Sequence, residues 1–263
     1  MILSGVVLWG TSAAATDPTF TRFSLETEMV HVPAGEFVMG ADQGSAASRP
    51  AHVVYLDAYY IDTYEVTNAR YKKCELSGAC RSIERFEEIS GPMQPIVGVK
   101  WEDAETFCRW EGKRLPTEAE WEKAARGPNG RVYPWGDMLS CERSNYGNGG
   151  PGVNGKARHP CPENEGRPVN VGSYMGDVSV YGAYDMGGNV WEYVADYYDA
   201  NYYKRSPVRN PEGPMTGLSH VIRGGAWHIS GSRMLSSSRI KRRLTSNGPA
   251  NSFDGFRCAR FDR

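Results

Sequence analysis

The chain has 263 residues, 40% of them hydrophobic, which is enough to bury one sizeable core in a single domain. Its formal net charge of −1 at pH 7 creates no long-range field for nucleic acid or acidic lipid, so neither is expected as a partner. Thirty glycines and 16 prolines predict many short elements joined by turns rather than a helical protein.

The first residues are typical of an export signal. Ile2 to Trp9 is an apolar run too short to span a bilayer, and Ala13 to Ala15 is a small-residue cleavage site. No Lys or Arg precedes the run, so an upstream start codon or a merely apolar tail remain as alternatives. We expect residues 1–15 to be a signal peptide, residues 16–28 to be an N-terminal extension and residues 29–263 to form one domain. This domain is expected to be exported, periplasmic or extracellular, and monomeric, without a membrane span.

The first half of the mature chain predicts strands followed by helices. Met29 to Gly40 is expected to form two short strands around a Pro/Gly turn, and the alternation from Ala51 to Ile61 predicts one longer strand. Thr67 can cap a helix over residues 68–77, with Gly78 as its stop.

Two further helices precede a loop-rich second half. Residues 101–111 place apolar side chains on one face of a helix that ends at Gly112. Thr117 and Glu120 have the spacing of a capping box and open a helix that ends near Gly127. Beyond it, strands are expected over Asn189 to Ala195, Val221 to Trp227 and Gly255 to Phe261. The elements predict a loop-rich domain with few helices.

The six cysteines are compatible with three disulfides, which have many possible connectivities. Two pairs each bracket a short loop that would gain from a cross-link, and the remaining two cysteines would form the third. The expected pairs are Cys74–Cys80, Cys141–Cys161 and Cys108–Cys258. The alternative is that all six are reduced, buried residues of a cytosolic protein; the loop positions of four of them favour disulfides and an oxidising compartment.

Charged residues suggest two further features. Arg114 is expected to form a partly buried ion network with Glu118 and Glu122, or else to stay exposed like them on a helix surface. The basic stretch Arg239 to Arg243 has no interleaved aromatic residues, so it is expected to be solvated or paired with carboxylates. The chain has no Gly-rich phosphate loop, nucleophile elbow or His-Glu-x-x-His zinc motif.

Eight segments in a fixed order carry a family resemblance. They are Val32–Gly40, Glu65–Asn68, Pro95–Val99, Gly112–Glu122, Tyr133–Gly136, Gly188–Glu192, Arg223–Gly225 and Gly255–Ala259. Together they resemble the formylglycine-generating enzyme, or sulfatase-modifying factor, family over about Met29 to Arg260. The resemblance implies a single, irregular α+β domain with that family's variant of the C-type lectin fold, and it places Cys108 beside Cys258. Fold alone does not give function.

The family's copper site is altered in this chain. In catalytic members, two cysteines between positions corresponding to 223 and 255 hold a copper ion; here those positions are Ile229 and Met234, which supply no thiolate. Ala226 stands where the family has a serine, and His228 with a lone Met more often packs than binds metal. The resemblance therefore implies that copper is not bound and that formylglycine is not made by the family's mechanism.

The resemblance also implies structural calcium. The ligands of a first site would be the Asp185 side chain, the Gly188 and Val190 carbonyls and the Glu192 carboxylate. These are hard oxygens of the kind calcium prefers, although an ordinary turn with its acids in solvent is the alternative. A second family site would use Asn145 and the Tyr146 carbonyl, with Glu163 substituting for the family's aspartate pattern.

Three functional hypotheses follow. The first is a calcium-stabilised, non-catalytic module that binds a peptide or protein in an aromatic groove, as catalytic relatives hold a Cys-x-Pro-x-Arg segment. Its candidate pocket residues are Trp191, Ala226, Trp227, His228, Ile229 and Met234, and its aromatic wall would be Trp191, Tyr193, Tyr197, Tyr198 and Trp227. Alternatively these aromatics fill the core, as Trp191 and Trp227 could equally do, while Tyr197, Tyr198, Tyr202 and Tyr203 are expected at the surface. The other hypotheses are an oxidoreductase with metal or oxygen chemistry that does not use cysteine, and formylglycine synthesis with displaced cysteines.

Overall fold

The computed structural model describes residues 28–85, 87–147, 166–229, 235–243 and 254–262. The expected signal peptide and nearly all of the N-terminal extension lie outside these ranges, as do Cys161, Glu163 and Met234. Among the described residues, no helix has the length and apolar character needed to cross a bilayer.

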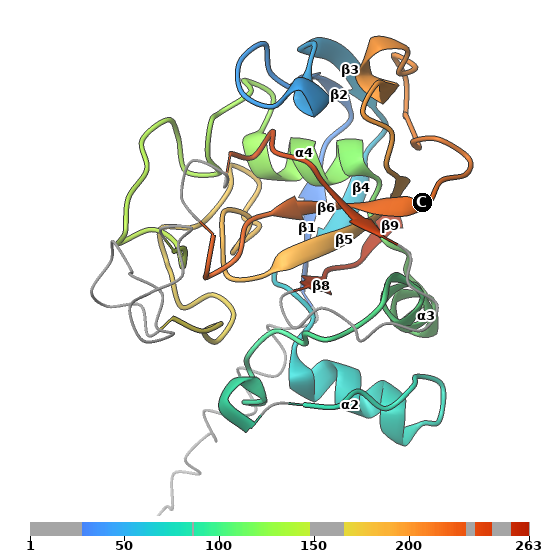
Figure 1. Ribbon diagram of the computed structural model, residues 1–263, viewed down its shortest axis with the longest axis vertical. Helices are drawn as coiled ribbons and strands as arrows, with labels where there is room; N and C mark the ends of the chain where they lie inside the picture. Colours follow the sequence, from blue (N-terminus) through green and yellow to red (C-terminus); the bar gives the residue numbers. More distant parts are fainter. Residues whose placement is uncertain (1–27, 86, 148–165, 230–234, 244–253, 263) are drawn as a thin grey trace, which may run out of the picture.

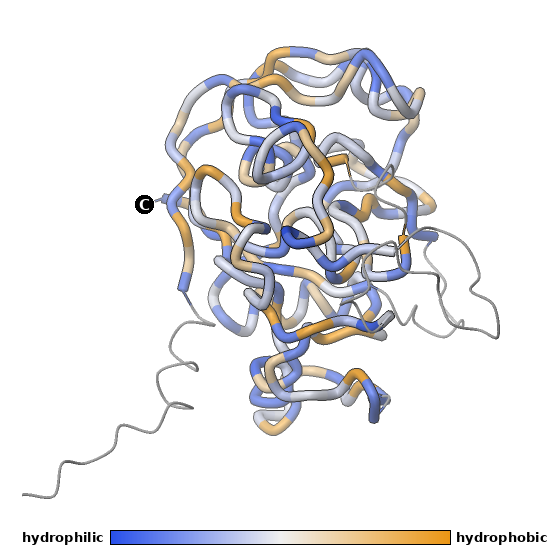
Figure 2. Tube along the Cα trace, turned by 90° about the vertical axis from the view of Figure 1, so that its left-hand side faces the viewer, coloured by the Kyte–Doolittle hydropathy of each residue, from blue (hydrophilic) through white to orange (hydrophobic). Residues whose placement is uncertain are grey.

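Within the described ranges, short strands and three α-helices make up most of the regular structure, which agrees with the predicted α+β, loop-rich class (Figure 1). The helices are α2 (Asn68–Leu76), α3 (Trp101–Trp110) and α4 (Glu118–Arg126). The strands are β1 (Met29–Val32), β2 (Gly35–Met39), β3 (His52–Leu56), β4 (Tyr59–Asp62), β5 (Trp191–Tyr197), β6 (Ser219–Gly224), β7 (Ile240–Arg243), β8 (Asp254–Phe256) and β9 (Ala259–Phe261). Single 3₁₀ turns occupy Ala46–Ser48, Glu87–Ile89 and Tyr202–Lys204. Apolar and polar residues alternate in short runs along the whole trace (Figure 2).

The strands form three small sheets. A three-stranded sheet has the order β1-β4-β9, β2 and β3 form a hairpin, and a four-stranded sheet has the order β7-β6-β5-β8. The β5–β8 pair is parallel, and the other strand pairs are antiparallel. The β2–β3 hairpin lies at one end of the molecule, α2 at the other, and α4 beside the central sheet (Figure 1).

The four-stranded sheet separates two apolar cores. Successive residues of a strand point to opposite faces, and Val221 and Ile222 of β6 accordingly belong to different clusters. Val221 packs with residues of β1 to β4 and α4, whereas Ile222 packs with residues of α2 and α3. Because both faces are covered, every residue of β6 is buried.

The helix signals in the sequence were read correctly. The Thr67 side chain accepts the Arg70 amide at the start of α2. Thr117 and Glu120 form the predicted capping box of α4: the Thr117 hydroxyl accepts the Glu120 amide at 3.2 Å, and the Glu120 carboxylate accepts the Thr117 amide at 2.8 Å. Gly127, with a φ of 68°, ends α4 in a conformation that favours glycine.

Two predicted strands are each divided in the structure. Residues 51–61 form β3 and β4, which belong to different sheets. The chain turns between them at Asp57, and the Asp57 amide donates to the Asn210 side chain at 2.9 Å. Residues 255–261 form β8 and β9, since the Arg257 guanidinium turns inward to Glu192 between them. The basic stretch at 239–243 contains the edge strand β7, which the sequence did not predict as a strand.

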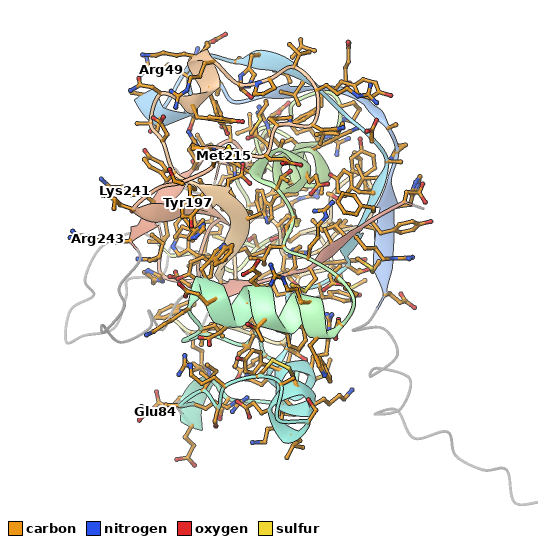
Figure 3. The ribbon with its side chains drawn as sticks, turned by 90° about the vertical axis from the view of Figure 1, so that its right-hand side faces the viewer. Arg49, Glu84, Tyr197, Met215, Lys241 and Arg243 are labelled. Atoms are coloured by element: carbon orange, nitrogen blue, oxygen red, sulfur yellow. A yellow bond between two sulfur atoms is a disulfide. The ribbon has the colours of Figure 1, made fainter. Side chains whose placement is uncertain are left out.

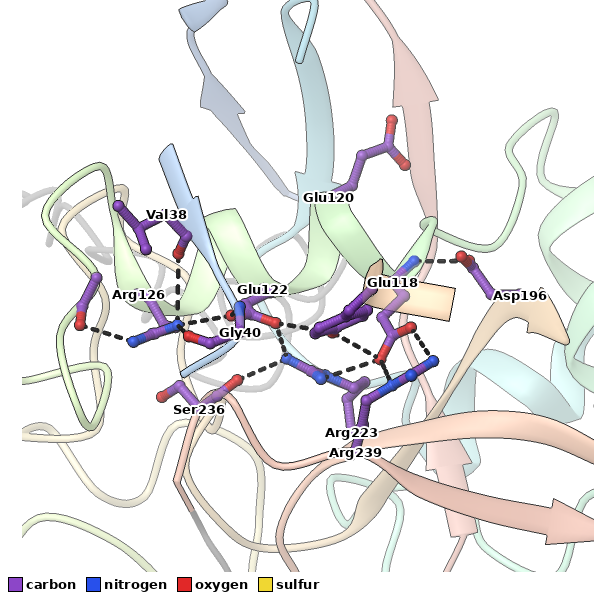
Figure 4. Close-up of polar contacts among 12 residues, drawn as sticks. Val38, Gly40, Glu118, Glu120, Glu122, Arg126, Asp196, Arg223, Ser236 and Arg239 are labelled. Carbon is purple, nitrogen blue, oxygen red and sulfur yellow. Dashed lines mark hydrogen bonds and ion pairs between the residues drawn. The ribbon is translucent and has the colours of Figure 1, made fainter. Parts of the chain in front are cut away.

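A fully buried ion network joins α4 to the four-stranded sheet (Figure 4). Glu118 and Glu122, one turn apart on α4, have 0% exposed side chains. Arg223 of β6 donates to both, at 3.1 Å to Glu118 and 2.6 Å to Glu122. Arg239 donates to Glu118 at 2.7 and 2.8 Å, and Arg126 to Glu122 at 2.7 Å. Although burial acts in the opposite direction, Arg223 and Arg126 hold the pKa of Glu122 below its usual value.

The network corrects two expectations from the sequence. Arg114 does not pair with Glu118 or Glu122; it binds Glu120, whose carboxylate points away from the network (Figure 4). Tyr203, expected at the surface, is buried, and its hydroxyl lies 3.2 Å from Glu118 and 3.3 Å from Glu122. Tyr202 is buried as well. The expectation that the 239–243 segment pairs with carboxylates is confirmed, because Arg242 binds Asp254 as Arg239 binds Glu118.

One disulfide is local and another joins distant parts of the chain. Cys74–Cys80 closes the loop after α2, and Cys108–Cys258 joins α3 to the segment between β8 and β9, 150 positions apart in sequence. Cys141 is disulfide-bonded too, while its expected partner Cys161 lies outside the described ranges. Two of the three predicted pairs are therefore confirmed, and no described cysteine is free.

Removing one acid from the network is expected to destabilise the fold strongly. Glu122→Ala removes the carboxylate partner of Arg126 and leaves Arg223 with Glu118 alone, which should cost about 3–5 kcal/mol of unfolding free energy. The matched change Glu105→Ala, which breaks an exposed pair with Arg109 on α3, should cost at most about 0.5 kcal/mol. Urea denaturation of both variants measures the difference, and equal losses would contradict a structural role for the network.

Candidate functional site

The segment that corresponds to the family's copper site follows β6. Gly224 ends the strand with a φ of 88°, and a Cβ there would lie 3.3 Å from the Trp121 indole, so the backbone passes close to α4. Ala226 is fully buried, and the Ile229 amide donates to the Ala226 carbonyl at 2.8 Å, which forms a turn. Ile229 packs against the core that contains α2 and α3. The segment is thus an ordered turn with an aliphatic side chain at the first former cysteine position.

A chain of backbone hydrogen bonds ties this turn to two neighbouring segments. The Gly147 amide donates to the Ile229 carbonyl, and the Trp227 amide to the Asn189 carbonyl, each at 2.9 Å. The Asn189 amide in turn donates to the Asn145 carbonyl at 2.9 Å. A Cβ on Gly147 would lie 2.8 Å from the His228 carbonyl carbon, so only glycine fits there. The turn and the segments around Asn145 and Asn189, where calcium is expected, form one connected layer.

His228 is a neutral imidazole in this environment. Burial, together with the positive charge of Arg242, lowers the pKa of His228 to about 4. The ring lies edge-on to Trp227, with centroids 4.9 Å apart. His228 is therefore unprotonated at neutral pH and can act as a nitrogen ligand or proton acceptor, whereas the described part of the chain offers no free thiolate, since its cysteines are disulfide-bonded.

The aromatic wall expected beside this turn is largely core. Trp191 is only 3% exposed, and Tyr193 is buried with its hydroxyl 3.3 Å from Asp254. Tyr197 stacks on His220 at a centroid distance of 4.2 Å, and Tyr198 lies under the Arg239 guanidinium, 5.0 Å from it. Among the predicted wall residues, Trp227, Tyr197 and Tyr198 are the ones that reach partial exposure. The alternative in which aromatics fill the core therefore holds for Trp191 and Tyr193.

The expected first calcium segment lies in a cluster of buried acids. Asp185 and Glu192 share this region with Glu65 and Asp177, and Arg257 is the cation that acts on all four. Burial raises the pKa of Asp185 to about 7, with the charge of Glu192 adding to the rise. Burial and the neighbouring carboxylates also raise the pKa of Glu65 and of Asp177 well above their ordinary values. The acids are not in solvent, and burial together with their mutual repulsion favours the protonated forms of Glu65, Asp177 and Asp185.

The two carboxylates among the four expected ligands differ in how free they are to bind a calcium ion. Both Glu192 carboxylate oxygens accept from Arg257, at 2.7 and 2.8 Å, and one also accepts from the Trp121 indole at 2.8 Å. Asp185 accepts the Gly172 amide through Oδ2 at 2.7 Å. Glu192 is therefore committed to Arg257, while Asp185 retains acceptor capacity beside Glu65 and Asp177. These two extra acids were not predicted, because Glu65 comes from a distant segment and Asp177 lies outside the 185–192 segment that the resemblance marks.

The expected second calcium position has one buried unsatisfied acceptor. Asn145 is 1% exposed, and its Oδ1 has no hydrogen-bond partner within the described ranges. Its Nδ2 donates to the Arg167 carbonyl at 3.0 Å and to Asn189 Oδ1 at 3.2 Å. A buried amide oxygen that accepts no hydrogen bond is available to coordinate a cation. Asn145 therefore fits the role that the resemblance implies for it.

Known proteins resemble the chain over almost its whole length. The model of the sulfatase-modifying factor enzyme 1-like domain family matches residues 14–261. The formylglycine-generating enzyme of Streptomyces coelicolor is 34% identical over 310 aligned positions, covering 94% of both proteins. The inactive C-alpha-formylglycine-generating enzyme 2 of Mus musculus is 30% identical over 88% of this chain and 85% of its own length. The serine/threonine-protein kinase pkn1 of Chlamydia caviae is 32% identical, but the chain spans only 38% of that protein.

A solved structure shares the fold. PvdO from Pseudomonas aeruginosa superimposes with a TM-score of 0.69 at 25% identity, covering 89% of this chain and 94% of PvdO. Because the similarity covers most of both chains, it concerns the domain as a whole and not a local motif.

His228 is expected to make stability depend on pH. Its pKa is about 4 in the folded state, against 6.5 for an unperturbed imidazole, so the unfolded chain takes up the proton first as pH falls. The contribution of His228 to stability should be complete above pH 6.5 and decline toward pH 4. Urea midpoints between pH 4 and 7 should therefore fall more steeply for the wild type than for His228→Gln. Parallel curves would show that His228 is not shielded from protonation.

Proposed function

This chain belongs to the sulfatase-modifying factor family, and from that premise we propose that it is an exported member without formylglycine-generating activity that binds a peptide or protein segment. Its fold is the family's irregular variant of the C-type lectin fold. The observation that carries the proposal is the turn after β6, where Ile229 stands at a copper-cysteine position within an intact, hydrogen-bonded scaffold.

The donor set does not fit copper. Cu(I) in this family requires soft thiolates, and Ile229 supplies an aliphatic side chain. Cys258, which lies next to Arg257 in sequence, is bonded to Cys108. That a mouse relative is named an inactive member agrees with loss of activity within the family. The disulfides fit a protein that folds in an oxidising compartment, which supports export.

A second candidate function rests on His228. The neutral imidazole beside Trp227 is a possible ligand for a metal that does not require cysteine, which would make the protein an oxidoreductase of altered chemistry. Metal analysis of protein purified without chelator separates the two candidates: stoichiometric iron or copper favours the oxidoreductase, and calcium alone favours the binding module.

Calcium is the proposed structural ion. The support is the group of buried carboxyl groups around Asp185, together with the unsatisfied Oδ1 of Asn145. Asp185 would hold a first calcium ion with the Gly188 and Val190 carbonyls, and Asn145 a second with the Tyr146 carbonyl; a divalent ion at the first site would offset the repulsion among the acids. Glu192 would act by positioning Arg257.

The wild-type protein is expected not to oxidise a sulfatase-type peptide. When the mature chain is loaded with Cu(I) under air, a Cys-x-Pro-x-Arg peptide should keep its mass, because no thiolate pair is available to bind the metal. The Streptomyces coelicolor enzyme under the same conditions is the positive control, with peptide mass spectrometry as the readout. Turnover by this chain would overturn the non-catalytic proposal.

Removal of calcium is expected to lower the melting temperature. Saturation at about a hundred times the Kd stabilises a protein by about 2.7 kcal/mol, and EGTA should abolish this gain. Asp185→Asn, which removes a ligand of the first site, should show a clearly smaller EGTA shift than the wild type, whereas the exposed control Glu36→Gln should respond as the wild type does. A wild-type melting temperature unmoved by EGTA would contradict a structural calcium ion.

A further inference from the structure

A separate concavity lies between α3, β9 and the segment around residues 210–212. Its volume is about 410 Å³, which is within the range of sites that bind small ligands or single side chains. None of its lining residues belongs to the turn at 226–229 or to the acidic cluster. Figure 3 views the molecule from the side of α3, and the labelled Met215 lies above that helix, on the loop that also supplies Glu212 to the cavity.

The middle of this concavity is apolar and preformed. Trp101, Leu115 and Phe261 contribute to its lining. The Trp101 indole donates to the Val194 carbonyl at 2.9 Å and stacks on His220 at a centroid distance of 4.0 Å, so its position is fixed from two directions. A ligand that packs against an already rigid aromatic side chain loses less conformational entropy on binding.

Phe261 forms the opposite, more open wall. It is 55% exposed, a high value for so large an apolar side chain. The Arg114 guanidinium lies 4.1 Å from the centre of its ring and is itself held by two 2.6 Å hydrogen bonds to Glu120. Arg114 is thus neutralised within the wall and holds Phe261 in place.

One end of the concavity is acidic. Glu105 lines it but pairs with Arg109, and Glu120 pairs with Arg114. Asp57 lines the cavity too but pairs with Arg209, whereas Glu212 lines it from an exposed position. The charge that this end offers to a ligand is therefore negative.

The other end is cationic. A second cavity of about 370 Å³ shares Arg114 and Phe261 with the first, and its remaining lining residues are Gly112, Lys113 and Arg260. Lys113 is already bound to Asp62 and Glu111, at 2.8 and 2.9 Å. Arg260 is exposed and rests on the Tyr60 ring, 4.4 Å from its centre. The two cavities together form one groove, the α3–β9 groove, with Glu212 toward one end and Arg260 toward the other.

We propose that the α3–β9 groove binds an extended peptide segment of a partner protein. A basic side chain of the segment lies against Glu212, a large apolar side chain packs between Trp101 and Phe261, and a carboxylate pairs with Arg260. Two adjoining compartments of opposite charge fit an extended chain with separated charges better than a compact small molecule. This surface goes beyond the proposed function, because it is formed by residues outside the turn after β6.

The test uses the whole mature chain and a labelled peptide, Lys-Gly-Phe-Gly-Glu, followed by fluorescence anisotropy. Replacing Phe of the peptide by Ala should weaken binding at least tenfold. Glu212→Lys should weaken binding of this peptide about tenfold and, in exchange, strengthen binding of Glu-Gly-Phe-Gly-Glu. Such a charge-reversal gain cannot result from unfolding. Arg260→Glu should likewise favour a peptide with lysine at both ends.

The control is Glu36→Lys, an equal charge change on the exposed face of β2, which should leave both affinities unchanged. No binding of the probe, or equal effects of Glu36→Lys and Glu212→Lys, would overturn the groove proposal. A third outcome is that Trp227→Ala abolishes binding of the probe while Glu212→Lys leaves binding unchanged. This outcome would also overturn the groove proposal, but it would support recognition at the turn after β6. The two proposals therefore fail on different results.

Discussion

The ion network beneath α4 determines how the rest of the molecule is arranged. Glu118 and Glu122 face inward because Arg223 and Arg239 meet them there, and α4 can then bury its whole length. A helix with buried acids has no stable position without these partners, because an unpaired buried carboxylate costs several kcal/mol. The network fixes α4 against β6, and β6 in turn leads directly into the turn that carries Ile229.

The scaffold is therefore held by interactions that do not involve the family's copper chemistry. The network, the Cys108–Cys258 cross-link and the Glu192–Arg257 pair each join segments far apart in the sequence. None of them includes Ile229 or Met234, the positions that the resemblance aligns with the family's cysteines. The fold of this chain therefore does not depend on those two side chains for its long-range cross-links.

Local signals in the sequence predicted the helices well. The capping box of Thr117 and Glu120 and the stop at Gly127 define α4 without any tertiary information. The sequence did not reveal which cations meet Glu118, because Arg223 and Arg239 lie 105 and 121 residues away and no local pattern encodes such pairs. The break between β3 and β4 was missed for the same reason.

The turn after β6 has one more consequence. Gly147, Trp227 and Ile229 are held by backbone amides and carbonyls, so the geometry at position 229 does not depend on which side chain stands there. The backbone of the turn can therefore keep its path when the side chain at this position differs, and the side chain then decides what chemistry the turn can offer.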